Sequence, residues 1–152
     1  MNQIEKGNYM KFFLMLGVSF VIMYGVMFLN ADKFDHVYLN MNRLYMALLM
    51  VAPMALVMLG FMTSMYKNKK LNTIIVGVSL VVLVGAFLLL RNQTLVDDKQ
   101  FLRSMIPHHS SAILVSQEAN ISDPEVKKLT EQIIESQEKE IAEMKAILER
   151  MK

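Results

Sequence analysis

The sequence contains no cysteine, and this absence limits the chemistry open to the protein. Without a thiol, the chain forms no disulfide and holds no metal ion through a thiolate. Chemistry with soft metal ions must therefore depend on methionine and histidine, of which the chain has 15 and 3.

Charged residues are also few. They make up 20% of the 152 residues, whereas hydrophobic residues make up 54%, which is too apolar for an ordinary soluble domain. Residues 1–92 carry eight Lys or Arg and three Asp or Glu, a net charge of +5, whereas residues 93–152 carry eight and eleven, a net charge of −3. This change predicts two domains, 1–92 and 93–152. We expect no nucleic acid partner, because a phosphate backbone requires a basic surface.

The patterns of the common enzyme classes are absent as well. The sequence shows no nucleophile paired with a base and no glycine-rich phosphate loop. We therefore expect a protein that is not an enzyme.

Three long apolar segments dominate the first domain, at about residues 12–29, 44–65 and 74–90. Each is close to the ~20 residues that a helix needs to cross ~30 Å of hydrocarbon, so membrane lipid is an expected partner. Five basic residues lie before the first segment or between the second and third, whereas two lie between the first and second. Because such residues tend to stay in the cytoplasm, we expect a multi-pass protein of the bacterial inner membrane, with a cytoplasmic N-terminus and a periplasmic second domain.

Methionine recurs every four residues along the second segment, at Met46, Met50, Met54, Met58 and Met62. On a helix this spacing forms a tilted ridge. The simpler interpretation is packing, because flexible thioethers fill irregular helix interfaces. The alternative is a path or store for Cu(I) or Ag(I), since soft ligands select soft ions.

The second domain has the pattern of a helical hairpin. Apolar residues follow a helical period from Asp97 to Ala119. Ser122-Asp123-Pro124-Glu125 supplies a capping residue and a proline that a first turn tolerates, so a second helix begins there. For antiparallel helices joined by a short turn, we expect residue 105 to face residue 138 and residue 109 to face residue 134.

Ligand-type side chains interrupt the apolar seam of this hairpin. Six of them carry nitrogen, oxygen or sulfur at positions that can meet across the seam: Met105, His108, His109, Gln137, Glu140 and Met144. They predict a metal site, although adjacent histidines also occur at solvated edges. Ligation requires neutral imidazole, so binding should weaken as the pH falls.

A second cluster, in the loop between the first two apolar segments, is Asp32, Asp35 and His36. It is either a secondary metal site or a chance grouping in a polar loop.

The string Met105-Ile106-Pro107-His108-His109, followed by Ala112-Ile113 and by Gln137-x-x-Glu140-Ile141-x-x-Met144, resembles the signature of a bacterial family, the domain of unknown function numbered 305. The resemblance covers about residues 95–152. It implies a membrane-anchored member of a helical, ferritin-like family associated with copper or silver tolerance. It favours Met105, His108, His109 and Met144 as ligands over Gln137 and Glu140. The chain has one hairpin where longer members have more, so a site that needs a second repeat would need another subunit.

These patterns predict an all-α fold: three transmembrane helices followed by an extracytoplasmic helical hairpin that forms a four-helix bundle by oligomerisation. A hairpin of this size buries too little surface to be comfortably stable alone, so we expect a homo-oligomer, most simply a dimer. The expected function is periplasmic binding of copper or silver, with metal-resistance proteins as partners. The alternatives are a structural or regulatory oligomer that binds a protein through its hairpin, and a small oligomeric metal transporter or channel.

Overall fold

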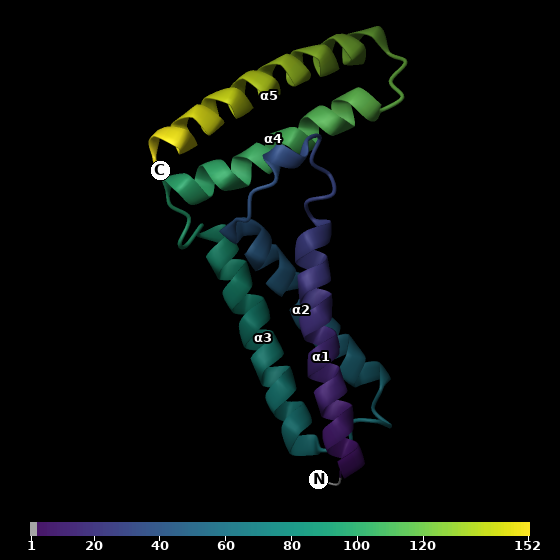
Figure 1. Ribbon diagram of the computed structural model, residues 1–152. Helices are drawn as coiled ribbons and strands as arrows, with labels where there is room; N and C mark the ends of the chain where they lie inside the picture. Colours follow the sequence, from purple (N-terminus) through teal and green to yellow (C-terminus); the bar gives the residue numbers. More distant parts are fainter. Residues whose placement is uncertain (1–2) are drawn as a thin grey trace. The chain divides into compact units, whose positions relative to one another are not determined.

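The computed structural model describes residues 3–152, which form five α-helices and one short 3-10 helix (Figure 1). The elements are α1 (Gln3–Val26), η1 (Phe34–His36), α2 (Met41–Phe61), α3 (Lys69–Arg91), α4 (Asp98–Glu118) and α5 (Pro124–Arg150). No β-strand occurs within residues 3–152. The prediction of an all-α fold is therefore confirmed.

The first three α-helices are long and apolar enough to cross a membrane. Their ends differ from the apolar segments in the sequence, because helical hydrogen bonding continues into polar residues while hydropathy marks only the apolar stretch. The first helix begins at Gln3 rather than near residue 12 and ends at Val26 rather than residue 29. The second ends at Phe61, so residues 62–65 lie outside the helix. Met62 comes directly after the last helical residue, and the other four methionines of the ridge are helical.

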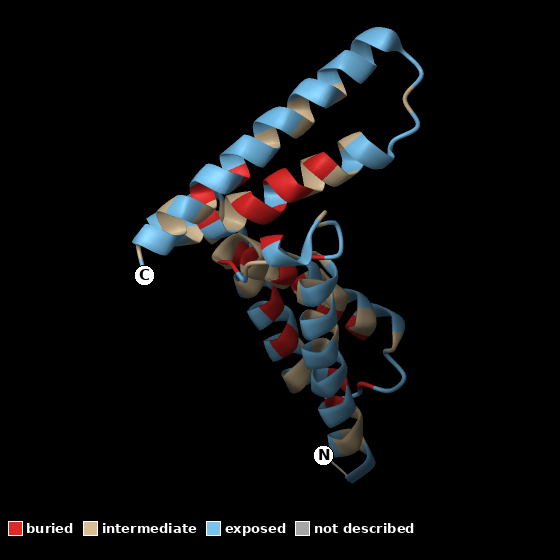
Figure 2. Cartoon of the chain, turned by 45° about the horizontal axis from the view of Figure 1, so that its top comes forward, coloured by how far each residue is buried: buried red, intermediate tan, exposed pale blue. Residues whose placement is uncertain are grey.

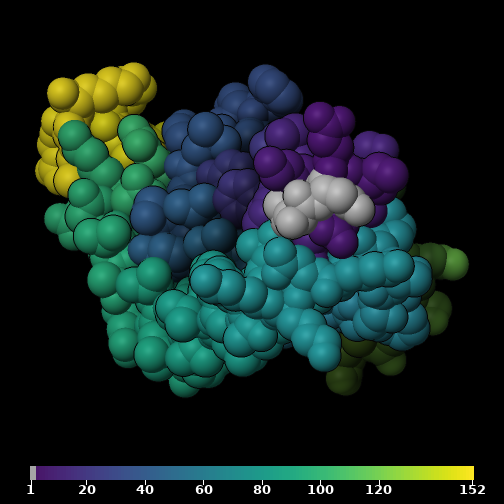
Figure 3. All heavy atoms as spheres, turned by 90° about the horizontal axis from the view of Figure 1, so that it is seen from below, coloured from purple at the N-terminus to yellow at the C-terminus, as the bar shows by residue number. Residues whose placement is uncertain are grey.

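These helices belong to one compact unit, which comprises α1, nearly all of α2, and α3. Its buried core includes Tyr9 and Phe12 of α1, which pack against Tyr66 in the segment between α2 and α3. The Tyr9 hydroxyl donates to Asn72 Oδ1 at 2.6 Å and accepts from the Asn68 backbone N–H at 3.2 Å. In Figure 3 the purple atoms of early α1 lie beside the teal atoms of this segment. Polar side chains thus join the two segments at this end of the unit.

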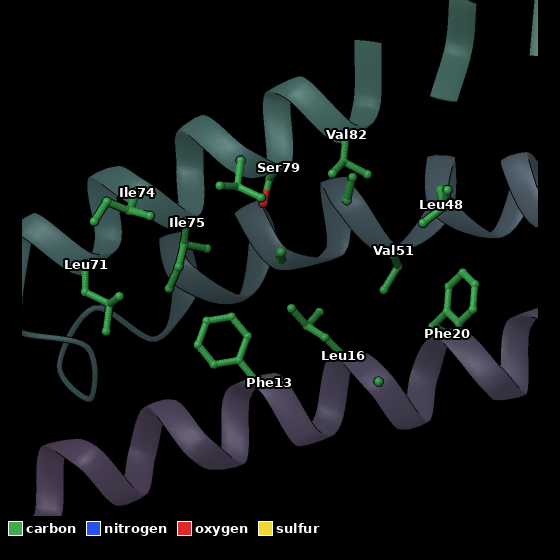
Figure 4. Close-up of a pocket in the computed structure, with 14 residues that line it drawn as sticks. Phe13, Leu16, Phe20, Leu48, Val51, Leu71, Ile74, Ile75, Ser79 and Val82 are labelled. Atoms are coloured by element: carbon green, nitrogen blue, oxygen red, sulfur yellow. The ribbon is translucent and has the colours of Figure 1, made fainter. Parts of the chain in front are cut away.

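A cavity of about 400 Å³ lies among α1, α2 and α3. Figure 4 shows Phe13 and Leu16 of α1 below the cavity and Ile75 of α3 above it. Apart from Ser79, the side chains that line it are apolar. This cavity therefore offers apolar surface and no charged group.

The second compact unit contains α4, α5 and also residues 27–41. The predicted domain boundary had placed residues 27–41 in the first domain, with the apolar segments. Ile106 and Ile113 of α4 are buried against Ile141 and Met144 of α5. Figure 2 shows buried residues along one face of α4, whereas most of α5 is exposed. The hairpin core is therefore a single seam between two helices.

Capping side chains set where the two hairpin helices begin. The Asp97 carboxylate accepts the Gln100 N–H at 2.8 Å, and the Asp123 carboxylate accepts the N–H groups of Glu125 and Val126 at 2.8 and 3.0 Å. Each bond satisfies a donor that a helix start leaves without an internal partner. Pro124 is the first residue of α5, as the sequence predicted.

The predicted register of the hairpin is wrong. His109 contacts Glu140, not a residue near position 134. Ala119 and Asp123, at the two ends of the connection, have extended backbone angles. An extended connection of about five residues reaches ~16 Å, whereas the prediction assumed a tight turn. The connection therefore allows α5 to begin beyond the end of α4, which moves the facing positions by six residues.

Candidate metal centre

The two adjacent histidines of α4 lie in different environments. His109 is 7% exposed, whereas His108 is exposed to solvent. Successive residues of an α-helix are about 100° apart around its axis, so one residue of such a pair can face a neighbouring helix while the other faces away. The two ring centroids are 6.0 Å apart. Only His109 therefore faces the seam with α5.

The hydrogen bonds of His109 fix its ring. Its Nδ1 lies 3.0 Å from the Met105 carbonyl oxygen, and its Nε2 lies 2.7 Å from Glu140 Oε2. A carbonyl oxygen can only accept, so Nδ1 carries a hydrogen and donates it. A metal ion can therefore bind the ring only at Nε2, in place of the present contact with Glu140. Histidine ligands of metal ions are commonly held in this way, with the second ring N–H on a backbone carbonyl.

Glu140 completes this pair from α5. The Ser136 hydroxyl donates to Glu140 Oε1 at 2.8 Å, while Oε2 faces His109. The hydrogen bond from Ser136, followed by that from His109, holds the pKa of Glu140 below its ordinary value of 4.5. The Glu140 side chain is 48% exposed, whereas that of His109 is 9% exposed. Glu140 is thus an anionic group between the buried imidazole and solvent.

A pocket of about 180 Å³ brings four of the six predicted ligands together. The four that line it are Met105, His109, Glu140 and Met144. The other two, His108 and Gln137, do not line it. His108 is exposed, and Gln137 is half-buried, three residues before Glu140 and nearly one helical turn away. Glu143, which the prediction did not include, lines the pocket as well, so the pocket offers one imidazole nitrogen, two carboxylates and two thioether sulfurs.

The spacing of these side chains indicates which metal ions the pocket can suit. Within residues 3–152 no three side chains of His, Cys, Asp or Glu are grouped as a metal site would require. Hard or borderline ions such as Mg²⁺ or Zn²⁺ prefer ligand sets of that kind. Two thioethers beside one imidazole instead match a soft ion such as Cu(I) or Ag(I).

The secondary cluster predicted in residues 32–36 is engaged in other contacts. Asp35 forms an ion pair with Lys145 at 2.5 Å, and His36 Nδ1 lies 2.9 Å from the Ser110 hydroxyl oxygen. The Asp32 backbone N–H donates to that same hydroxyl at 2.8 Å. The side chains of the two neighbours make only a long contact, with His36 Nε2 3.9 Å from Asp35 Oδ1. These contacts hold the loop to the hairpin and do not converge on a metal position.

Two serines near the candidate centre escaped the sequence reasoning. Ser136 precedes Glu140 by four residues, and this helical spacing was a signal that could have identified the hydrogen bond. Ser110 follows His109 directly, and its partners lie 74 and 78 residues away in the chain, so no local pattern reveals them.

Comparison with known proteins identifies the family. The model of the family described as a domain of unknown function (DUF305) matches residues 89–148, which include the candidate centre. An uncharacterised protein of Acanthamoeba polyphaga mimivirus is 39% identical over 142 residues, and the match covers 91% of each chain. The chain belongs to the DUF305 family. No solved structure matches this DUF305 protein.

Proposed function

We propose that this DUF305 protein binds a soft metal ion, Cu(I) or Ag(I), through His109, Met105 and Met144, and that its role is the handling or tolerance of that metal. The observation that supports this most directly is the pocket lined by these residues together with Glu140. A site of imidazole and thioethers suits a compartment in which thiols would be oxidised. The match to the DUF305 model over the same residues agrees with the family resemblance.

Binding in this pocket exchanges a proton for the metal ion. A distance of 2.7 Å between His109 Nε2 and a carboxylate oxygen is that of a hydrogen bond, so a proton lies between these atoms. A metal ion that takes the lone pair of Nε2 must displace this proton. Glu140 then supplies an anionic oxygen beside the bound cation. Metal binding should accordingly release protons and weaken as the pH falls.

We also propose the cellular arrangement. The three helices long and apolar enough to cross a membrane support a multi-pass membrane protein. The distribution of basic residues favours a cytoplasmic N-terminus and an extracytoplasmic hairpin, which in a bacterium is periplasmic. A soft metal that enters from outside would meet the hairpin before the membrane.

Single histidine variants of the full-length protein in mild detergent test the metal proposal. Titration with Ag(I), and with Cu(I) under reducing conditions, gives the dissociation constant of each variant. We expect His109→Ala to weaken binding at least about tenfold, a change of ~1.4 kcal/mol. The matched control His108→Ala, one residue away and exposed, should stay within about twofold of the wild type. Equal loss in both variants, or loss in neither, would refute the assignment.

Exposed apolar residues near the connection between α4 and α5 favour a second function, that of a structural or regulatory oligomer. Val115, Val126 and Leu129 are 62%, 43% and 53% exposed. They offer surface to a second copy or to a partner protein, as a structural or regulatory oligomer requires. Mass measurement in mild detergent distinguishes the cases: a dimer supports a four-helix bundle of two hairpins, and a monomer with a folded hairpin excludes it.

A further inference from the structure

A second pocket of the hairpin unit, of about 440 Å³, has a different chemistry from the candidate metal centre. It lies among the start of α4, the end of α5 and the loop residues Asp35 and Tyr38. Six charged side chains line this cationic cleft: Lys99, Arg103, Lys145, Lys152, Asp35 and Glu149. With four cations and two carboxylates, the side chains that line the cleft have a formal net charge of +2.

The two carboxylates of the cationic cleft are already paired. Asp35 Oδ2 lies 2.5 Å from Lys145 Nζ, and Glu149 Oε1 lies 2.5 Å from Lys152 Nζ. Lys99 and Arg103 form no ion pair or side-chain hydrogen bond within residues 3–152. The acidic residues at the start of α4, Asp97 and Asp98, do not line the cleft. Two cations therefore remain available to a ligand.

The geometry of these two cations indicates which ligand they suit. Lys99 and Arg103 are four residues apart on α4, so their side chains extend from the same face. A guanidinium group matches the oxygen atoms of a phosphate through two parallel hydrogen bonds, and an ammonium group adds a point charge. Tyr38 also lines the cleft, and its hydroxyl has no hydrogen-bond partner within the described residues. Three residues that line the cleft thus carry side-chain donors without acceptors among the described residues.

We infer that the cationic cleft binds a phosphate group, with Arg103 and Lys99 as its principal contacts. The group can belong to a phospholipid headgroup or to a soluble phosphate compound. Tyr38 is followed after two residues by the first residue of α2, a helix apolar enough to cross a membrane, so a lipid headgroup is one of the two sources to test. This site is separate from the proposed metal centre, because the two pockets share no lining residue.

Two probes of the full-length protein in a neutral detergent distinguish the two sources. Inorganic phosphate represents the soluble ligand, and short-chain phosphatidylglycerol, compared with phosphatidylcholine, represents an anionic headgroup. Calorimetry gives the dissociation constant of each probe at low ionic strength, where screening is weak. Binding of phosphate or of phosphatidylglycerol supports the inference and names the source. Binding of neither probe to the wild type would overturn it.

Matched double variants then test the residues. Lys99→Gln/Arg103→Gln removes the two cations without ion-pair partners, and both are exposed, so the fold should persist. Lys127→Gln/Lys128→Gln removes the same charge from exposed positions near the start of α5, away from the cleft. We expect the first variant to weaken binding of the active probe about tenfold or more and the second to stay within about twofold. Equal weakening in both would show attraction to net charge alone and would refute the site.

Discussion

Ser110 shows how one buried side chain can hold two distant parts of this chain together. Its hydroxyl is fully buried, accepts the Asp32 N–H at 2.8 Å and lies 2.9 Å from His36 Nδ1. Because the hydroxyl has one hydrogen and two lone pairs, it can accept from Asp32 and donate to His36 at the same time. In that arrangement the His36 ring is neutral.

Replacement of this hydroxyl should destabilise the hairpin unit. In Ser110→Ala the Asp32 N–H and His36 Nδ1 lose their partner, and a buried polar group left unpaired costs about 1–3 kcal/mol. The matched control is Ser111→Ala, whose hydroxyl accepts only an exposed bond from Asn30. Thermal unfolding followed by circular dichroism in detergent should show the larger loss for Ser110→Ala. Equal stability of the two variants would contradict this role.

His36 should make the hairpin unit sensitive to acid. Burial, followed by the charge of Lys145, lowers the pKa of His36 below its ordinary value of 6.5, although Asp35 acts in the opposite direction. The unfolded loop therefore binds a proton at a higher pH than the folded loop does. The free energy of unfolding is at its full value above about pH 6.5 and falls as the pH drops below it.

This pH dependence can be measured against a variant that does not titrate. Between about pH 7 and pH 5, the melting temperature of the wild type should fall relative to that of His36→Asn. The difference between the two curves isolates His36 from the other titratable groups. Parallel melting curves over this interval would show that protonation of His36 does not affect stability.

At the scale of elements, α4 is the helix on which the hairpin unit depends. One face carries the seam with α5, and the same helix holds the loop through Ser110, Ser111 and Gln100. Pro107 lies inside this helix, yet α4 is continuous from Asp98 to Glu118. The helix therefore continues past the one backbone donor that proline lacks.

Truncation of the seam should show how much it contributes. Ile106 is fully buried between the helices, so Ile106→Ala should lower the free energy of unfolding by about 2–5 kcal/mol, through lost burial and an unfilled cavity. Gln117, which is exposed on the same helix, provides the control. The free energy of unfolding of Gln117→Ala, from chemical denaturation, should differ little from that of the wild type. A similar small effect for Ile106→Ala would mean that the seam does not stabilise the hairpin.

The helices could be predicted from the sequence, but the pairing between them could not. Apolar periodicity and the Asp123-Pro124 start define α4 and α5 locally. The register depends on the extended connection after α4, which leaves no mark in a hydrophobic pattern. As a result, the sequence identified Glu140 and Met144 as possible ligands, but it predicted residue 134 opposite His109, where the structure has Glu140. The packing of residues 27–41 on the hairpin also depends on long-range hydrogen bonds that sequence spacing does not encode.

At the scale of the whole molecule, the chain combines helices apolar enough to cross a membrane with a hairpin that offers a buried imidazole and two thioethers. The complete absence of cysteine means that a soft metal ion has only methionine sulfur available in this chain. The proposed site therefore requires sulfur and nitrogen ligands on the same ion. Loss of affinity in a histidine variant does not by itself establish sulfur ligation.

X-ray absorption spectroscopy of the full-length protein loaded with one equivalent of Cu(I) tests for such a site, because it distinguishes sulfur from lighter ligands. We expect thioether sulfur and imidazole nitrogen in the first coordination shell. In Met105→Leu/Met144→Leu, which keeps the side-chain volume nearly unchanged, the sulfur contribution should disappear. A first shell of nitrogen and oxygen alone in the wild type, or a sulfur signal that persists in this variant, would contradict the proposed site.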